Sequence, residues 1–275
     1  MRILIKILAI GVLLTNLATE LSAQQDSPLR RLTLRSDIFG WEAVGRLDID
    51  NKGYCTGVLL RPDIVMTAAH CLFEHDQGKY KEPKSIIFRA GLRDGNSVAD
   101  RAAIRAVVHR KYRTSNEDER NNTRYDVGLL QLAKPIPAAI AAPFKVQSFS
   151  GLGRKVSVVS YARGRDKTLS WQRSCGVRAR QNGLIAFSCD VDFGSSGAPV
   201  FNLSAGGARI VSIISGGNRE GGKVVSIGME LPDIVDELIA DLHSGRGAYP
   251  RTSTTSKRLR VGEGAKDIGA RFLRP

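Results

Sequence analysis

The chain has 275 residues, of which 42% are hydrophobic and 25% are charged, and its formal net charge is +14. A chain of this length and composition can bury a sizeable core, which excludes an intrinsically disordered protein. The length fits one large β domain or two smaller ones, and the positive charge raises the question of contact with anionic surfaces without naming a partner.

The first 23 residues have the pattern of a removable export signal. Arg2 and Lys6 form a short positive region, an apolar run follows from Ile7 to Leu14, and Leu21-Ser22-Ala23 supplies a small-residue cleavage site. A membrane anchor is the alternative, but the apolar run is shorter than the roughly 20 residues that a spanning helix needs. We therefore expect cleavage after Ala23 and a secreted or periplasmic protein.

Export to an oxidising compartment favours disulfides for the four cysteines, for which three pairings are formally possible. We favour the two local pairs, Cys55–Cys71 and Cys175–Cys189. Each would close a loop of about 15 residues, for which the chain-entropy model gives roughly 3 kcal/mol. A zinc site is disfavoured because no C-x₂-C spacing occurs, so we expect no metal and no cofactor.

Short β-branched runs recur along the chain between Gly, Pro, Asn and Asp residues, and they predict strands. The runs lie at residues 58–60, 64–66, 85–88, 103–108, 127–132, 155–160, 184–187, 210–214 and 224–227. This pattern is typical of an all-β barrel or sandwich. Between the runs, Lys134-Pro135-Ile136-Pro137 indicates a connection between two halves. Apolar residues at three-to-four spacing behind Pro232 predict one helix, Pro232–Leu242.

The positive charge lies mainly in two segments. Residues 151–180 hold eight Lys or Arg against one Asp, a net charge of +7, and residues 246–275 hold a net charge of +6. After Gly245 the composition is polar and basic without apolar periodicity, which predicts a flexible tail. The two segments are either a solvated face and a solubilising tail or a contact for anionic surfaces through the basic tail. We expect no stable nucleic-acid complex.

Three motifs can carry chemistry. His70 lies in Thr67-Ala68-Ala69-His70-Cys71, where small residues and a cysteine expected in a disulfide would mount a general base rigidly. Asp126 opens the apolar run Asp126-Val127-Gly128-Leu129-Leu130. A Gly-rich turn, Gly194-Ser195-Ser196-Gly197-Ala198-Pro199, presents two serines.

In the order His, Asp, Ser, these motifs resemble the trypsin-like (chymotrypsin-fold) serine endopeptidases. The resemblance runs from Trp41 to the terminal helix, about 200 residues. It implies an all-β fold of two six-stranded antiparallel β-barrels with a C-terminal helix and an active site between the barrels. The domain limits follow as a signal at 1–23, an N-terminal segment at 24–36, barrels at 37–140 and 141–230, the helix at 231–244 and the basic tail at 245–275.

The resemblance also implies roles for individual residues. Ser196 matches the nucleophile, His70 the general base and Asp126 the carboxylate that orients the imidazole. The backbone N–H groups of Gly194 and Ser196 match the oxyanion hole. Ser215 matches a residue that supports the aspartate, and together with Gly216 and Gly217 it lines the substrate cleft.

Departures from the family pattern bear on activation. Ser195 occupies the place where many members have the aspartate that pairs with a newly released N-terminus, and no Ile-Val-Gly-Gly-like sequence precedes Trp41. We therefore expect no trypsin-style activation, with local hydrogen bonds holding the oxyanion loop instead.

The substrate pocket departs from the family pattern as well. Asp190 lies six residues before Ser196, where trypsin places the acidic floor of its pocket, which indicates cleavage after Lys or Arg. Asp192 replaces the cysteine that trypsin has four residues before its serine, and Cys189 stands seven residues before Ser196. The pocket wall is therefore built differently, and small apolar or acidic specificity remains the alternative.

These features predict a secreted or periplasmic serine endopeptidase that hydrolyses protein or peptide substrates through a Ser-His-Asp triad and an acyl-enzyme, as a monomer. The alternative is a non-catalytic protease-fold module that binds acidic surfaces or polysaccharide. Covalent labelling by an organophosphonate distinguishes the two.

Overall fold

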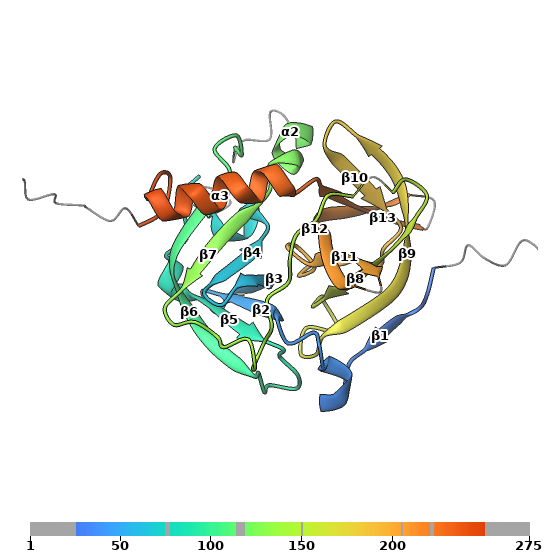
Figure 1. Ribbon diagram of the computed structural model, residues 1–275, viewed down its shortest axis with the longest axis horizontal. Helices are drawn as coiled ribbons and strands as arrows, with labels where there is room; N and C mark the ends of the chain where they lie inside the picture. The colour runs from blue at the N-terminus through green and yellow to red at the C-terminus, as the bar shows by residue number, and fades with distance from the viewer. Residues whose placement is uncertain are drawn as a thin grey trace, which may run out of the picture.

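A computed structural model describes residues 26–74, 78–113, 119–149, 151–204, 206–220 and 223–250. The predicted export signal and the basic tail beyond residue 250 lie outside these residues. In the described part of the chain strands dominate, and no helix there is both long and apolar enough to cross a bilayer. Figure 1 shows two groups of strands side by side, the first from the N-terminal half and the second from the C-terminal half.

Six strands close the first barrel in the order β2-β3-β4-β7-β6-β5, with antiparallel pairing throughout. The strands are β2 (Val44–Ile49), β3 (Gly53–Arg61), β4 (Ile64–Thr67), β5 (Ile86–Ala90), β6 (Ala99–Val108) and β7 (Gly128–Leu132). In β2 the two-residue period of a strand places Leu47 and Ile49 in the barrel core and turns Arg46 and Asp48 to the opposite face. These two charged residues are available to contact the second barrel.

The second barrel also has six antiparallel strands, and it closes because β8 pairs with both β9 and β11. The strands are β8 (Lys155–Ser160), β9 (Ser170–Gln181), β10 (Leu184–Phe187), β11 (Pro199–Ser204), β12 (Gly207–Glu220) and β13 (Lys223–Met229). The two-barrel architecture that the resemblance implied is therefore present.

The N-terminal segment is part of the second barrel's sheet. Strand β1 (Leu29–Arg31) pairs with β9, so that Leu29 lies opposite Gln172. Beyond β1, Leu32 and the end of the 3-10 helix η1 (Arg35–Ile38) are buried against both barrels. A three-residue strand is too short to show a period, which is why the sequence did not predict β1.

All nine predicted strand runs overlap observed strands, but β1, β2, β9 and β11 were not predicted. Strand β9 is the longest of the four, with the sequence SWQRSCGVRARQ. Its C-terminal half is exposed and carries Arg178 and Arg180, so the apolar alternation that marks a strand is missing there. Three short helices complete the element list: η2 (Ala69–Leu72), η3 (Pro83–Ser85) and α2 (Glu119–Arg124).

The predicted C-terminal helix is present as α3 (Pro232–Ser244). The chain leaves the second barrel and crosses back, so that α3 packs on β6 and β7 of the first barrel with Val235, Leu238 and Leu242 buried (Figure 1). The segment after α3 is ordered as far as residue 250. Tyr249 exchanges two backbone hydrogen bonds of 2.7 Å with Ala106, and its ring stacks on Tyr80. The basic tail expected from residue 245 therefore begins as a segment fixed to the first barrel.

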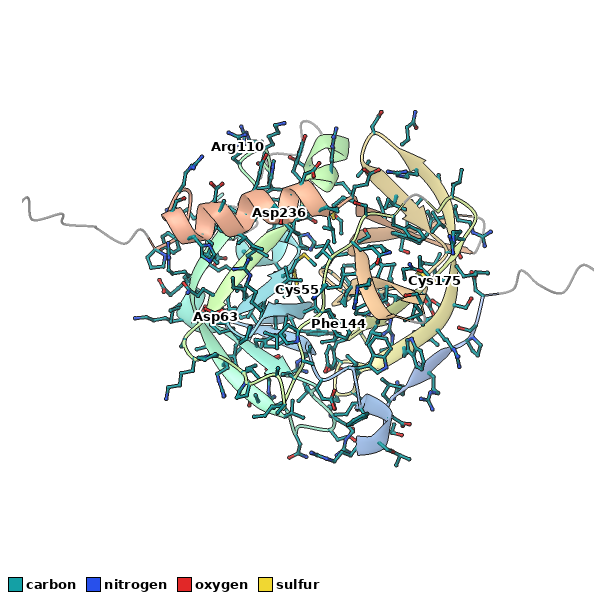
Figure 2. All side chains as sticks on the ribbon, in the orientation of Figure 1. Cys55, Asp63, Arg110, Phe144, Cys175 and Asp236 are labelled. Atoms are coloured by element: carbon teal, nitrogen blue, oxygen red, sulfur yellow. A yellow bond between two sulfur atoms is a disulfide. The ribbon has the colours of Figure 1, made fainter. Side chains whose placement is uncertain are left out.

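An apolar seam joins the two barrels. Phe144, in the connection between them, has its ring centroid 4.7 Å from that of Phe201 and 5.9 Å from that of Trp41, and Figure 2 shows it between the two barrels. The same cluster contains buried Met66 from the first barrel and Tyr161 from the second. Close-packed interiors are not easily deformed, so these contacts fix the position of one barrel relative to the other. Residues from both barrels can therefore be held in one site.

Candidate active site

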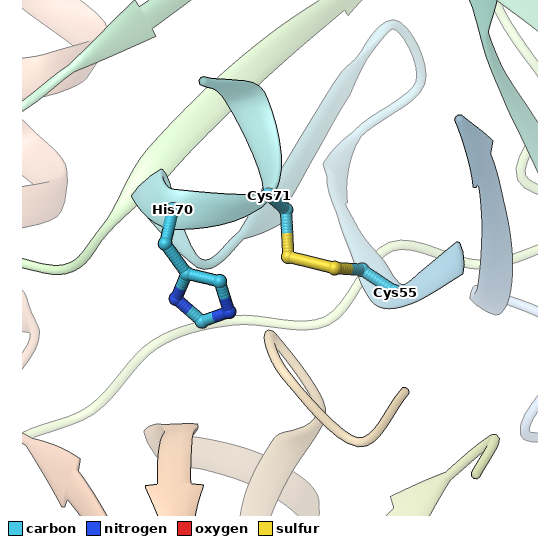
Figure 3. A group of neighbouring side chains, drawn as sticks. All are labelled: Cys55, His70 and Cys71. Atoms are coloured by element: carbon cyan, nitrogen blue, oxygen red, sulfur yellow. A yellow bond between two sulfur atoms is a disulfide. The ribbon is translucent and has the colours of Figure 1, made fainter. Parts of the chain in front are cut away.

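His70 is mounted at the end of β4, on the short helix η2. The preceding Ala68 and Ala69 are fully buried, and the next residue, Cys71, is joined to Cys55 of β3 by a disulfide. Figure 3 shows the imidazole projecting from η2 beside this disulfide. The His70 side chain is 27% exposed, so one edge of the ring faces the solvent. The disulfide restrains the backbone of η2 and so the direction in which the His70 side chain projects.

The Cys55, His70 and Cys71 side chains lie within 4.8 Å of one another, a spacing compatible with metal binding. Their chemistry does not fit a metal. The two sulfurs are bonded to each other and cannot act as thiolate ligands, and His70 Nδ1 is already bonded to a carboxylate. The second predicted disulfide, Cys175–Cys189, is also present.

Asp126 is 3% exposed and accepts three hydrogen bonds. Its Oδ1 accepts the backbone N–H of His70 at 2.8 Å. Its Oδ2 lies 2.7 Å from His70 Nδ1 and accepts the Ser215 hydroxyl at 2.6 Å. The carboxylate therefore holds the imidazole as the Nδ1–H tautomer, with Nε2 left to accept a proton. Ser215 comes from β12 of the second barrel, so this chain of bonds crosses the seam.

The pKa of His70 is raised above its ordinary value. Burial alone lowers the pKa, but the charge of Asp126 and its hydrogen bond to the ring raise it by more, while Lys81 opposes them weakly. The ring is thus partly removed from water while Asp126 stabilises its protonated form. A histidine in such surroundings is suited to accept and return a proton near neutral pH.

Ser196 lies in what we call the nucleophile loop, residues 190–197. Its carbonyl oxygen accepts the N–H of Thr56 at 2.9 Å, and the N–H of Gly197 donates to the carbonyl of Ile214, next to Ser215. A Cβ at Gly197 would come within 2.8 Å of the Ala68 nitrogen, so this turn lies directly against the segment that leads to His70. Among the described residues, Ser196 Oγ and His70 Nε2 do not hydrogen bond, and such bonds commonly tighten only when substrate binds.

Gly194 has φ +94°, a backbone conformation that favours glycine. A Cβ there would come 2.1 Å from the Tyr54 ring, so this aromatic residue of the first barrel lies directly against Gly194. In the described chain, neither the Gly194 N–H nor the Ser196 N–H donates to another protein group. Donors to an oxyanion must likewise be free of a protein acceptor, so this observation is compatible with the predicted role of the two groups.

Ser195 differs sharply from its neighbour. It is 1% exposed, and its hydroxyl accepts the Asp192 N–H at 3.3 Å and donates to the Tyr161 carbonyl at 3.4 Å. A further bond joins the Ser195 N–H to the Asp192 carbonyl. Ser195, at the place of the family's aspartate, is thus bonded to Asp192 of its own loop and to Tyr161.

A second loop, residues 161–168, which we call the bracing loop, packs behind the nucleophile loop. The N–H of Arg163 donates to the Phe193 carbonyl at 2.7 Å, and its guanidinium contacts the Asp192 carboxylate at 3.1 Å and lies over the Phe193 ring. Arg165 donates to Ser160 and, at 3.4 Å, to the Asp190 carbonyl. Burial lowers the pKa of Arg165, while Asp190 and Asp192 raise it by less.

The residues predicted to line the substrate pocket have different surroundings. A Cβ on Gly216 would meet no atom within 4 Å, whereas one on Gly217 would come 2.8 Å from Val191. Asp190 is partly buried, and its N–H donates to Gln172. The Arg165 guanidinium beside Asp190 was not predicted, because nothing in the sequence tells which of the eight basic residues at 151–180 turns inward.

Three further residues of the site were not predicted from the sequence, and they lie around Gly194: Tyr54, Thr56 and Tyr161. Thr56 Oγ1 donates to the Gly194 carbonyl at 2.8 Å, and the Tyr161 N–H donates to Thr56 Oγ1 at 3.1 Å. The only signal in the sequence was the position of Tyr54 and Thr56 on either side of Cys55.

The fold and the site define a class. The family model described as trypsin-like peptidase domain matches residues 55–208, a span that includes His70, Asp126 and Ser196. The chain belongs to the trypsin-like peptidase family.

Among curated proteins, a glutamyl endopeptidase of Bacillus licheniformis is 25% identical over 154 residues, which are 56% of this chain and 46% of that protein. A protein named extracellular metalloprotease from Bacillus subtilis is 26% identical over 167 residues, 59% of this chain and 51% of that protein. The chain thus spans about half the length of the curated relatives it matches.

Solved structures share the fold. A Glu endopeptidase in complex with MPD has a TM-score of 0.63 at 15% identity, covering 81% of this chain and 98% of that one. The protease Anisep from Arthrobacter nicotinovorans has a TM-score of 0.57 at 16% identity, covering 72% of this chain and 93% of that one.

Proposed function

We propose that the protein is a serine endopeptidase in which Ser196 is the nucleophile, His70 the general base and Asp126 the residue that orients the base. The observation that carries the proposal is the hydrogen-bonded chain from Ser215 through Asp126 to His70 Nδ1, with bonds of 2.6 and 2.7 Å. A buried carboxylate that accepts three hydrogen bonds adds nothing to apolar packing. A histidine that acts as a general base requires such a group, because it fixes the ring tautomer and stabilises the imidazolium.

In the proposed reaction, Ser196 Oγ attacks the carbonyl carbon of the scissile peptide bond and gives its proton to His70 Nε2. The oxyanion is bound by the N–H groups of Gly194 and Ser196. Collapse of the tetrahedral intermediate breaks the C–N bond, and the proton on His70 passes to the leaving amine. Water, activated by the same imidazole, then releases the acyl group from Ser196 and restores the hydroxyl.

A metal-dependent reaction is the competing class, because one curated relative is named a metalloprotease. The donor chemistry around His70 argues against it here, since the neighbouring sulfurs form a disulfide. We expect full activity in a chelator and complete loss on Ser196→Ala.

For specificity, we propose cleavage after Lys or Arg, on the strength of Asp190. The Arg165 guanidinium, 3.4 Å from the Asp190 carbonyl, offsets part of the attraction that this carboxylate has for a basic side chain. The positive charge of Arg165 would favour an acidic substrate side chain instead, and one relative is named a glutamyl endopeptidase. Acidic specificity is therefore the alternative.

Digestion of a peptide library by the secreted protein tests both proposals, with Ser196→Ala as the control for contaminating proteases. We expect cleavage after Lys or Arg that falls sharply in Asp190→Asn. Cleavage after Glu or Asp that persists in Asp190→Asn would remove Asp190 from the role of selecting substrate.

We also propose that activity requires no trypsin-style cleavage. Leu29–Arg31 pair with β9, and Leu32 and Ile38 pack into the core. The Ser195 hydroxyl is already bonded to Asp192 and Tyr161. A newly formed N-terminus near residue 38 that proved necessary for activity would contradict this. Export and removal of residues 1–23 remain part of the proposal, and N-terminal sequencing of the secreted protein tests them.

A further inference from the structure

We propose that Arg46 of the first barrel is a positioning residue that sets the shape of the nucleophile loop in the second barrel. The inference rests on the proposed function, because it concerns the N–H groups that would bind the oxyanion. Arg46 neither contacts the loop itself nor belongs to any motif that the sequence analysis singled out.

Arg46 is itself held in one orientation. Its Nε and Nη2 bond the two oxygens of Asp48 at 2.5 and 3.1 Å, a bidentate pair within strand β2. The side chain is only 17% exposed, and Arg89 of β5 adds a second cation 3.7 Å from Asp48. A guanidinium held this way is a rigid support, because its planar fork fixes direction as well as distance.

The first route from Arg46 to the nucleophile loop runs through Tyr54. The Arg46 guanidinium carbon lies 5.5 Å from the centre of the Tyr54 ring. The same ring also contacts Gly194, where a Cβ would come within 2.1 Å of a Tyr54 ring carbon. Arg46 and Gly194 therefore contact the same aromatic ring, so a shift of Tyr54 would reach the residue that carries one of the proposed oxyanion N–H groups.

The second route runs through the bracing loop. Arg46 Nη1 donates to the Asp166 carbonyl at 3.0 Å and lies 3.6 Å from the Asp166 carboxylate. Just before Asp166 in the same loop, Arg165 donates to the Asp190 carbonyl and the Arg163 N–H donates to the Phe193 carbonyl. One guanidinium of the first barrel thus supports the nucleophile loop through Gly194 and also through residues 190–193.

Loss of this support should displace the oxyanion N–H groups while leaving His70 and Asp126 untouched, because no Arg46 contact reaches them. Misplacement by about 1 Å commonly costs on the order of 100-fold in rate. We therefore expect Arg46→Met to lower kcat by roughly 10- to 100-fold, with a smaller rise in KM because Val191, in the supported segment, adjoins Gly217 of the proposed substrate cleft. The pH at which activity is half lost on the acid side should not move.

The test compares four forms of the full chain: wild type, Arg46→Met, Arg46→Lys and Arg180→Met. Arg180→Met is the matched control, because it removes a 2.6 Å ion pair with Glu230, and within the described residues neither partner bonds the nucleophile loop or the bracing loop. The readouts are the second-order rate of labelling by an organophosphonate probe, kcat, KM and the pH profile. We expect slow labelling in Arg46→Met, partial recovery in Arg46→Lys and the wild-type rate in Arg180→Met.

Wild-type labelling of Arg46→Met, or an equal loss in Arg180→Met, would overturn the inference. So would a loss confined to KM. If Arg46→Met does not fold, as judged by circular dichroism, Arg46→Lys carries the test, with an expected loss of roughly threefold to tenfold because a lysine cannot make the bidentate bond. Failure of the wild type itself to label would instead overturn the proposed function, so the two failures are distinguishable.

Discussion

At the scale of single residues, Asp126 decides what His70 can do. Its two oxygens accept from the His70 backbone and from the His70 ring, so one carboxylate fixes both the position and the tautomer of the imidazole. Ser215 holds the carboxylate from the opposite barrel. The sequence indicated this grouping only through its resemblance to a family, because the three residues are far apart along the chain.

The pH dependence of activity follows from these contacts. In the proposed reaction His70 must be neutral to accept the Ser196 proton, so we expect activity to be lost as the pH falls through the His70 pKa. Because Asp126 raises that pKa, the acid limb of kcat/KM should show an apparent pKa above the ordinary value of about 6.5.

In Asp126→Asn the raising influence of the carboxylate disappears and burial remains, so the apparent pKa of the acid limb should fall. The rate should drop by roughly 10⁴-fold, because the ring is then held in the wrong tautomer. Pre-steady-state acylation rates across pH 5 to about 9 measure both effects. An unchanged acid limb in this variant would show that Asp126 does not control His70.

At the scale of elements, β3 and η2 are joined by the Cys55–Cys71 disulfide, with a sequence separation of 16 residues. Cys55 is flanked by Tyr54 and Thr56, which contact Gly194, while Cys71 adjoins His70. The disulfide therefore joins the segment that carries His70, the proposed base, to the residues that contact Gly194.

Replacing Cys55 and Cys71 together by Ala should lower the free energy of unfolding by about 3 kcal/mol. It should also lower kcat at temperatures where the protein remains folded. The Cys175→Ala, Cys189→Ala variant is the matched control. The disulfide that it removes closes a loop of similar length in the second barrel and does not contact His70. Equal kcat values for the two double variants would contradict this link.

The elements also show where sequence reasoning stops. Buried strands such as β4, whose four residues are all buried, have continuous apolar runs and were predicted. Strand β9 and the short β1 were not, because exposure and brevity remove the pattern. The triad motifs were recognisable because each is contiguous. Arg46 was not recognisable, because what it touches depends on how the two barrels meet. Arg165 was not recognisable, because its contacts depend on how two loops of the second barrel pack together.

At the scale of the whole molecule, the basic side chains that make up the excess charge have different surroundings. Within residues 151–180, Arg163 and Arg165 turn toward the nucleophile loop, while Lys155 and Arg178 contact Asp26 of the N-terminal segment. Part of the basic segment is thus used internally. Contact with anionic surfaces through the tail remains a prediction, and salt-dependent retention on heparin tests it.

The limits of the tail predict two different truncations. Ending the chain after Pro250 should leave the unfolding temperature unchanged. Ending it after Ser244 removes the Tyr249–Ala106 bonds and the Tyr80 stack, worth about 2 to 3 kcal/mol together, and should lower Tm by about 5 to 10 °C. Calorimetry of both truncated forms checks this, and equal Tm values would contradict an ordered segment at residues 245–250.

The central claim is that Ser196, and not the adjacent Ser195, is the nucleophile. The two serines differ clearly in the structure, because Ser195 is buried with its hydroxyl bonded whereas Ser196 is partly exposed. The direct measurement is tandem mass spectrometry of the secreted protein after reaction with an organophosphonate probe. We predict a phosphonate adduct on Ser196, absent from His70→Ala. No adduct, or an adduct on Ser195, would contradict the account.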